Sequence, residues 1–332
     1  MSKIIRFATL DDVDNIMKFI DNYWKHNHIL ARDKKFFLYE HQDNDRINFV
    51  ISLKDNKINA ILGFIKYSQD KSDVATVLWK VIKNENPMLG IELLNFLRES
   101  NEYNIVFSPG INEDIIGIFN FLDIYTSYYE HFVLINHQIK NYKILSIIDR
   151  QNIPILNFQY NKYTVKDLDL NDIDFDFNKY YSNYIPKKDK NYFIKRYFQH
   201  PIYKYKIFGI YKDIQLISLL VTREVCINDS KIIRIVDYLG NEKYLLYIMD
   251  YLYKLLLKYQ YEYMDFMCYG FDQNILLKAG FVKVNLDSND LIVPNYFAPF
   301  VQKNIKINFM MDSKDIQKIR LCKADGDQDR PS

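Results

Sequence analysis

This sequence has few cysteines and almost no net charge. Each of these features excludes classes of protein. The cysteines, Cys226, Cys268 and Cys322, are scattered without CxxC or metal-ligand spacing. This pattern argues against a disulfide framework, predicts no metal site and indicates a reducing compartment, by default the cytoplasm. The 44 basic and 42 acidic side chains leave a net charge of only +2, so nucleic acid is disfavoured as a partner.

Long apolar runs are also missing from the chain. No stretch approaches the roughly 18 apolar residues that a membrane-spanning helix needs. The start, MSKIIRFATLDDVDNI, lacks the basic and apolar regions of an export signal. We therefore expect no transmembrane segment.

What the sequence does contain is one pattern that occurs twice. Phe49 to Gly63 and Ile207 to Val221 are both apolar strands joined by a tight Lys-Asp turn. Each hairpin is followed by another strand, a helix, a short strand, a helix and a last strand. In the first copy this last strand covers residues 125–135. The pattern predicts two copies of one α/β unit, each a mixed central sheet flanked by helices.

The length of 332 residues agrees with two domains. We assign residues 1–150 to the first unit, 151–310 to the second and 311–332 to a polar C-terminal tail. The ending of this tail, KADGDQDRPS, has the composition of a flexible segment.

The element order and several residues resemble the GNAT family of acyl-CoA transferases. The residues that carry the resemblance are Ile5-Arg6, Ala8-Thr9, Asp11-Asp12, Gly63, Leu78-Trp79-Lys80-Val81 and Pro87 to Leu94. The resemblance implies acyl-CoA as co-substrate, with its pyrophosphate on backbone N–H groups at the start of a helix. The implied cofactor-binding residues are Lys80, Val81, Ile82, Met88, Leu89, Gly90 and Ile91. Close packing of this helix on the sheet is an alternative explanation for Gly90, which the motif leaves open.

The two copies differ where the coenzyme is expected. In the second copy Glu242 would place a negative charge beside the pyrophosphate, a repulsion of ~1 kcal/mol at ~4 Å in water and more when desolvated. We therefore expect the first unit to bind acyl-CoA. The tyrosine that protonates the CoA thiolate in many family members is replaced by Phe119 in the first copy and by Leu276 in the second. A thiolate with an ordinary pKa of about 8.5 leaves without a strong acid, so this loss weakens catalysis without excluding it.

An amine that attacks a thioester needs a general base, and His28 and Asp237 are the candidates. For each of them a structural role, in a capped turn or a salt bridge, is the stronger alternative. The candidate substrate-binding residues are Trp24, Arg196, His200, Arg223 and Arg234. Arginine forks suit a diphosphate, and ion pairs with Asp172, Asp174 or Asp176 are the competing explanation. Tyr129 and His131 share a strand face, where they either flank the thioester or, as the favoured alternative, belong to a solvated surface.

The chain as a whole resembles acyltransferase-like proteins of bacterial surface-glycan biosynthesis. The segments that carry this resemblance are WKHNHILARD, HPIYKYKIFGI, IRIVDYLG and the GDQDRP ending. It implies an acyl-CoA-dependent N-acyltransferase that acts on the amino group of a nucleotide-linked amino sugar in surface polysaccharide biosynthesis. Small molecules are then the partners, and the sequence leaves open whether the chain forms a homo-oligomer.

Two alternatives remain. A Fem-like aminoacyl ligase is another tandem arrangement of GNAT units, and it predicts a basic groove and a helical hairpin insertion. A catalytically degenerate tandem GNAT scaffold would explain why both copies lack the tyrosine.

Overall fold

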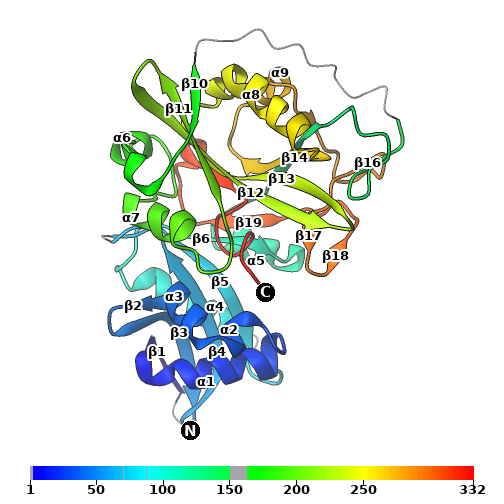
Figure 1. Cartoon of the computed structure of the whole chain (residues 1–332). Coiled ribbons are helices and arrows are strands. Elements are labelled where there is room, and N and C mark those ends of the chain that lie inside the picture. The colour runs from blue at the N-terminus through cyan, green and yellow to red at the C-terminus, as the bar shows by residue number, and fades with distance from the viewer. Residues whose placement is uncertain (1–2, 70, 87, 150–162) are drawn as a thin grey trace.

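The computed structural model describes residues 3–69, 71–86, 88–149 and 163–332. Figure 1 shows the N-terminal unit in blue and cyan at the bottom, the second unit in green to orange above it, and the red C-terminal segment between them. Pro87 and the expected boundary between residues 150 and 151 lie outside the described residues.

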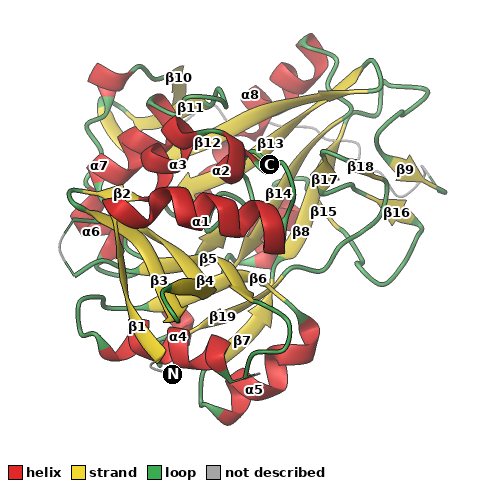
Figure 2. Ribbon diagram, turned by 90° about the horizontal axis from the view of Figure 1, so that it is seen from below, coloured by secondary structure: helices red, strands yellow, loops and turns green. Residues whose placement is uncertain are grey.

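The first unit is a sheet with helices on both faces. Helices α1 to α3 cover one face with apolar side chains such as Ile16 and Phe37, and α4 covers the other with Leu93 and Leu97 (Figure 2). In chain order its elements are β1 (Lys3–Thr9), α1 (Val13–Phe19), η2 (Ile20–Trp24), α2 (Ile29–Arg32), α3 (Lys34–His41), β2 (Gln42–Asp43), β3 (Arg46–Lys54), β4 (Lys57–Lys66), β5 (Val74–Val81), α4 (Leu89–Glu99), β6 (Val106–Ile111), α5 (Ile116–Phe121) and β7 (Tyr125–Tyr128).

Local sequence explains several boundaries in this unit. The carboxylate of Asp33 accepts a hydrogen bond of 2.9 Å from the N–H of Phe36 and so begins α3. Asp55 and Asn56 adopt left-handed φ angles of 52° and 60°. This conformation confirms the predicted hairpin turn, because tight two-residue turns between strands require positive φ.

The second unit repeats this plan. Asp213, with φ of 56°, occupies the turn that corresponds to Asp55. Its elements are β10 (Thr164–Asp167), α6 (Phe177–Tyr181), α7 (Lys190–Phe193), η6 (Ile194–Phe198), β11 (Lys206–Lys212), β12 (Gln215–Ile227), β13 (Ser230–Leu239), α8 (Leu245–Lys258), β14 (Tyr263–Tyr269), α9 (Gln273–Lys278) and β15 (Val282–Lys283). Within the described ranges, no helix combines the length and the apolar character that crossing a membrane requires.

Among the described residues, both sheets have eight strands in the same order, which confirms the predicted repeat. The first runs β1-β3-β4-β5-β6-β19-β7 with β2 beside β3, and the second runs β10-β11-β12-β13-β14-β8-β15 with β20 beside β14. One parallel pair in each, β5 with β6 and β13 with β14, makes the sheets mixed. The predicted α/β class is therefore confirmed.

The two units exchange one strand each. β8 (Glu130–Ile135) pairs with β14 in the second sheet, whereas β19 (Asn308–Met311) returns to the first sheet and pairs with both β6 and β7. The expected single strand over 125–135 is wrong, because the chain crosses from one sheet to the other at Tyr129. The N–H of Tyr129 donates to the carbonyl of Ile307, 2.9 Å away, so the two crossing segments touch.

The expectation of a flexible C-terminal segment is also wrong. β20 (Leu321–Cys322) pairs with β14, and Ala324 and Asp325 are fully buried. The polar composition misled because several charges of this segment are paired inside the fold. Asp325 lies 2.9 Å from Lys188, and Asp329 lies 2.5 Å from Arg223.

Candidate active site

A cavity of about 340 Å³ lies between the two units, and we call it the central cavity. Its wall combines η2, α2, α3 and β5 of the first unit with β12 and β13 of the second and with two C-terminal stretches. The lining residues are Trp24, Lys25, His28, Leu30, Phe36, Glu40, His41, Ile65, Val77, Leu78, Tyr203, Arg223, Val225, Arg234, 295–298 and 327–332. Four of the predicted catalytic and substrate-binding residues, Trp24, His28, Arg223 and Arg234, are thus brought together.

His28 lines this cavity and also caps a helix. Its Nδ1 accepts a hydrogen bond of 3.3 Å from the N–H of Leu30 at the start of α2. Burial, and secondarily the charges of Lys25 and Arg32, lower the pKa of His28 to about 4. The ring is therefore neutral at pH 7, and with Nδ1 accepting, its proton is on Nε2. In this tautomer His28 can donate a hydrogen bond from Nε2, but it cannot accept a proton there.

The guanidinium groups in the cavity wall are already paired with carboxylates. Arg223 contacts Asp329 through Nε at 3.0 Å and Nη2 at 2.5 Å, and Arg234 contacts Asp265 through Nε at 3.1 Å and Nη2 at 2.5 Å. The acidic partners are Asp265 and Asp329, rather than the three aspartates considered from the sequence. Two-point pairing of this kind occupies the fork that a diphosphate would need.

The other predicted residues lie away from the central cavity. The carboxylate of Asp237 is buried and accepts hydrogen bonds from Lys188 Nζ at 2.8 Å and Tyr197 Oη at 2.6 Å. His200 accepts from the N–H groups of Ile202 and Tyr203 and packs among aromatic rings. Arg196 lies in a neighbouring cleft.

Tyr129 and His131 are fully buried, so the favoured alternative of a solvated surface is wrong. His131 contacts Asp265 at 3.0 Å, on the same carboxylate that holds Arg234. Both residues therefore belong to the interior between the sheets.

The sequence analysis missed Asp327, a carboxylate in the wall of the central cavity. Burial raises its pKa to about 6, against the opposing effects of a 2.8 Å hydrogen bond from Gln328 Nε2 and the charge of Lys323. It is therefore mainly ionised at pH 7 and can accept a proton. The only sequence signal was the GDQDRP ending, whose polar composition pointed to a tail.

The parallel strands of each sheet separate after a short paired stretch. β5 pairs with β6 only at Val74–Val106 and Ala75–Phe107, and Val77 and Leu78, just beyond, line the central cavity. Among the expected coenzyme ligands on and just after β5, the N–H of Ile82 already donates to Asn59 O at 3.1 Å. Because N–H groups alternate along a strand, Val81 presents its backbone to the space beside β6, whereas Lys80 faces β4.

Comparison with solved structures identifies this architecture. The chain is similar to a GCN5-related N-acetyltransferase from Anabaena variabilis ATCC 29413, with a TM-score of 0.60, 9% identity and coverage of 93% of this chain and 72% of that one. The chain has a tandem GNAT-like fold. A probable N-acyltransferase from Enterococcus faecalis V583 gives a TM-score of 0.57 at 6% identity, covering 94% of this chain and 72% of that one.

A putative acetyltransferase from Pyrococcus horikoshii is similar over 95% of this chain and 91% of its own, with a TM-score of 0.50 and 11% identity. No protein-family model matches the sequence. A search of curated proteins finds no match either.

The helix entry of the first GNAT-like unit contains the remaining coenzyme candidates. Asn86 already accepts hydrogen bonds from the N–H groups of Met88 and Leu89, through Oδ1 at 3.0 Å and its carbonyl at 2.9 Å. Gly90 packs on Trp79, because a Cβ there would lie 3.0 Å from Trp79 Nε1. Close packing therefore accounts for this glycine, while the N–H groups of Gly90 and Ile91 belong to the first turn of α4, where anions bind.

The second GNAT-like unit differs at both corresponding places. β13 and β14 separate after Ile235 and Phe266, and β20 lies in the gap: Cys322 pairs with β14, and the N–H of Ala324 donates to Val236 O at 2.8 Å. At the helix entry, Glu242 is buried and lies 3.7 Å from Arg320. We call the gap that opens where two parallel strands separate a wedge. The chain's own C-terminal segment thus fills the wedge between β13 and β14.

Proposed function

We propose that the protein is an acyl-CoA-dependent N-acyltransferase. The observation that carries the proposal is the asymmetry between the two wedges: C-terminal residues fill the one between β13 and β14, whereas no strand is inserted between β5 and β6 in the described part of the chain. Acyl-CoA would lie along the backbone of β5 near Val81, with its pyrophosphate at the start of α4. The first unit is then the donor domain, and the second unit serves as the acceptor domain.

The central cavity suits direct attack of an amine on the thioester. It adjoins β5 beyond the point where that strand leaves β6, so an acceptor there would face the acyl group. Attack forms the C–N bond and an oxyanion, which backbone N–H groups of β5 would stabilise, and collapse releases the CoA thiolate. Asp327 is the carboxylate placed to accept the proton of the amine, and His28 donates a hydrogen bond from Nε2.

The acceptor that we propose is an amino sugar, nucleotide-linked, used in the cytoplasm for surface polysaccharide biosynthesis. This choice derives from the resemblance to surface-glycan acyltransferases. A Fem-like ligase receives less support, because the described residues contain no helical hairpin insertion. The scaffold alternative is favoured only for the second unit, because the wedge between β13 and β14 is filled and leaves that unit a binding role without catalysis.

Calorimetric titration with acetyl-CoA tests the proposal. We expect binding with one acetyl-CoA per chain. Met88, exposed by 53% at the start of α4, offers a variant that leaves the packing of Gly90 intact. Met88→Asp should weaken binding roughly fivefold or more through charge repulsion, whereas the neutral Met88→Asn should not.

Failure of acetyl-CoA and other short acyl-CoAs to bind or to raise the melting temperature would remove the proposal and leave the scaffold alternative. Binding of two molecules per chain would contradict the assignment of the donor site to the first unit.

A further inference from the structure

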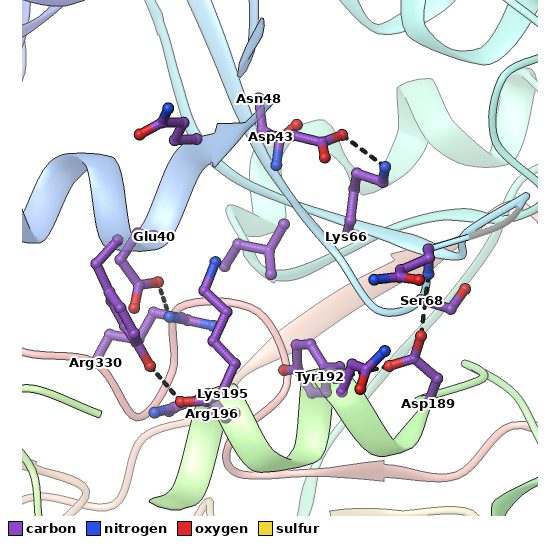
Figure 3. Close-up of a pocket in the computed structure, with 15 residues that line it drawn as sticks. Glu40, Asp43, Asn48, Lys66, Ser68, Asp189, Tyr192, Lys195, Arg196 and Arg330 are labelled. Carbon is purple, nitrogen blue, oxygen red and sulfur yellow. Dashed lines mark hydrogen bonds and ion pairs between the residues drawn. The ribbon is translucent and has the colours of Figure 1, made fainter. Parts of the chain in front are cut away.

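A second cavity, of about 180 Å³, lies beside the central cavity, and none of the steps described above uses it. It is bounded by α3 and the end of β4 in the first unit and by α7 and η6 in the second (Figure 3), and we call it the α3–α7 cleft. Glu40, Ile65 and Arg330 line both cavities. The ion pair between Glu40 and Arg330 therefore lies where the two cavities adjoin.

Three buried side chains of the cleft carry polar atoms without a hydrogen-bond partner in the described part of the chain. These atoms are Glu40 Oε1, Tyr192 Oη and Arg196 Nε, on side chains that are exposed by 7%, 8% and 2%. Unsatisfied polar atoms at such sites reduce stability, so their retention in a cavity wall points to a ligand. Glu40 Oε1 accepts a hydrogen bond, Arg196 Nε donates one and Tyr192 Oη can do both. Hydroxyl groups of a ligand can pair with all three.

The rest of the wall combines charged side chains with uncharged polar ones. Amide side chains are contributed by Gln42, Asn48, Gln69 and Asn191, and Ile65 is the one aliphatic residue among the lining residues. Amides offer donors and acceptors together, as hydroxylated ligands require.

Most charges in the cleft are already compensated. Lys66 lies 2.7 Å from Asp43, and Asp189 accepts a hydrogen bond of 2.7 Å from the N–H of Tyr192 at the start of α7. Lys195 differs: its ammonium lies 5.2 Å from the ring centroid of Tyr39, and it forms no ion pair with any described residue. One positive charge therefore remains for a ligand. Figure 3 shows Lys195 among the residues that line the cleft.

We infer that the α3–α7 cleft binds a small polyhydroxylated molecule that carries an anionic group. The anion contacts Lys195, and the hydroxyl groups contact Glu40, Tyr192 and Arg196. The identity of the occupant rests on the proposed function: it is the part of the acceptor remote from the amine, which reaches the central cavity past Glu40 and Arg330. The acceptor would thus occupy two subsites.

Calorimetric titration of the full chain with glucose 1-phosphate, UDP-glucose and inorganic phosphate tests the inference. We expect glucose 1-phosphate to bind at least tenfold more tightly than inorganic phosphate. Lys195→Gln should weaken its binding roughly five- to tenfold, and Asn191→Ala roughly threefold. Lys204→Gln, an exposed lysine outside both cavities, should leave it unchanged. Tighter binding of UDP-glucose would support a nucleotide-linked occupant, and equal binding a free sugar phosphate.

The inference is overturned if neither sugar phosphate binds, if inorganic phosphate binds equally well, or if the Lys195 and Lys204 variants behave alike. Acetyl-CoA titrated into the same samples separates the two proposals. Loss of acetyl-CoA binding with retained sugar-phosphate binding removes the acyl-transfer function and leaves the cleft assignment intact.

Discussion

At the scale of single residues, buried charge dominates the region between the two units. Arg234 with Asp265, Arg223 with Asp329, and Lys188 with Asp237 are pairs in which at least one partner is fully buried. Removing one member of such a pair leaves an uncompensated charge and costs about 3–5 kcal/mol. Their variants would therefore lose activity through unfolding, which makes them poor tests of mechanism.

Asp327 gives a sharper test, because its role depends on pH. As the acceptor of the amine proton it must be ionised, so we expect kcat/KM to fall as the pH drops through its pKa of about 6. Asp327→Asn should lower kcat about 100-fold and abolish this acid limb. The measurement is release of CoA from acetyl-CoA with the best amine of a panel, between pH 5 and 8.

The stability of the fold should respond to Asp327 in a defined direction. Its pKa is raised in the folded state above the ordinary 3.8, so the folded state binds more protons in this window. Its contribution to stability is therefore present at low pH and is lost as the pH rises from about 4 to about 6.

An acid limb of kcat/KM that persists in Asp327→Asn would assign the amine proton to another group.

At the scale of elements, the filled wedge depends on close approach of two backbones. Gly270 follows β14 with φ of 84°, and a Cβ there would lie 1.9 Å from the carbonyl oxygen of Ile319. Ile319 belongs to the stretch that leads into β20. The glycine is thus required both for its backbone conformation and for space.

Gly270→Ala should therefore destabilise the protein by about 2 kcal/mol or more, since it adds left-handed strain to a backbone clash. Gly117→Ala in α5 is the matched control, because a Cβ there meets no atom within 4 Å. We expect that variant to be neutral or slightly stabilising. Chemical denaturation measures both, and equal midpoints would show that Ile319 is not packed against Gly270.

At the scale of the whole molecule, the exchange of β8 and β19 joins the units into one folding entity. Each sheet contains a strand from the other half of the chain. We expect residues 1–149 expressed alone to aggregate or remain unfolded, because the first sheet then lacks β19 and β8 has no partner. Co-expression with residues 163–332 should give a one-to-one complex by size-exclusion chromatography. A soluble, cooperatively melting 1–149 fragment would contradict this expectation.

The sequence by itself determined the repeat, the mixed sheets and the hairpin turns, because these depend on local patterns such as Asp55-Asn56 and Asp213. It also brought Trp24, His28, Arg223 and Arg234 forward as site candidates. Their assembly around one cavity was decided only by tertiary structure. The strand exchange, the partners of the arginines, the partial burial of Asp327 and the full burial of Asp329 were also decided only by tertiary structure.

The physical reason is that a polar segment can be exposed or can pair its charges inside the fold, and composition is the same in both cases. The ending KADGDQDRPS contains the acids that neutralise Lys188 and Arg223, and both basic residues lie more than 100 positions earlier in the chain. Pairing over that separation depends on how the two units pack. The sequence thus specified each unit, and only the packing of the two units placed the C-terminal segment in the second wedge and in the wall of the central cavity.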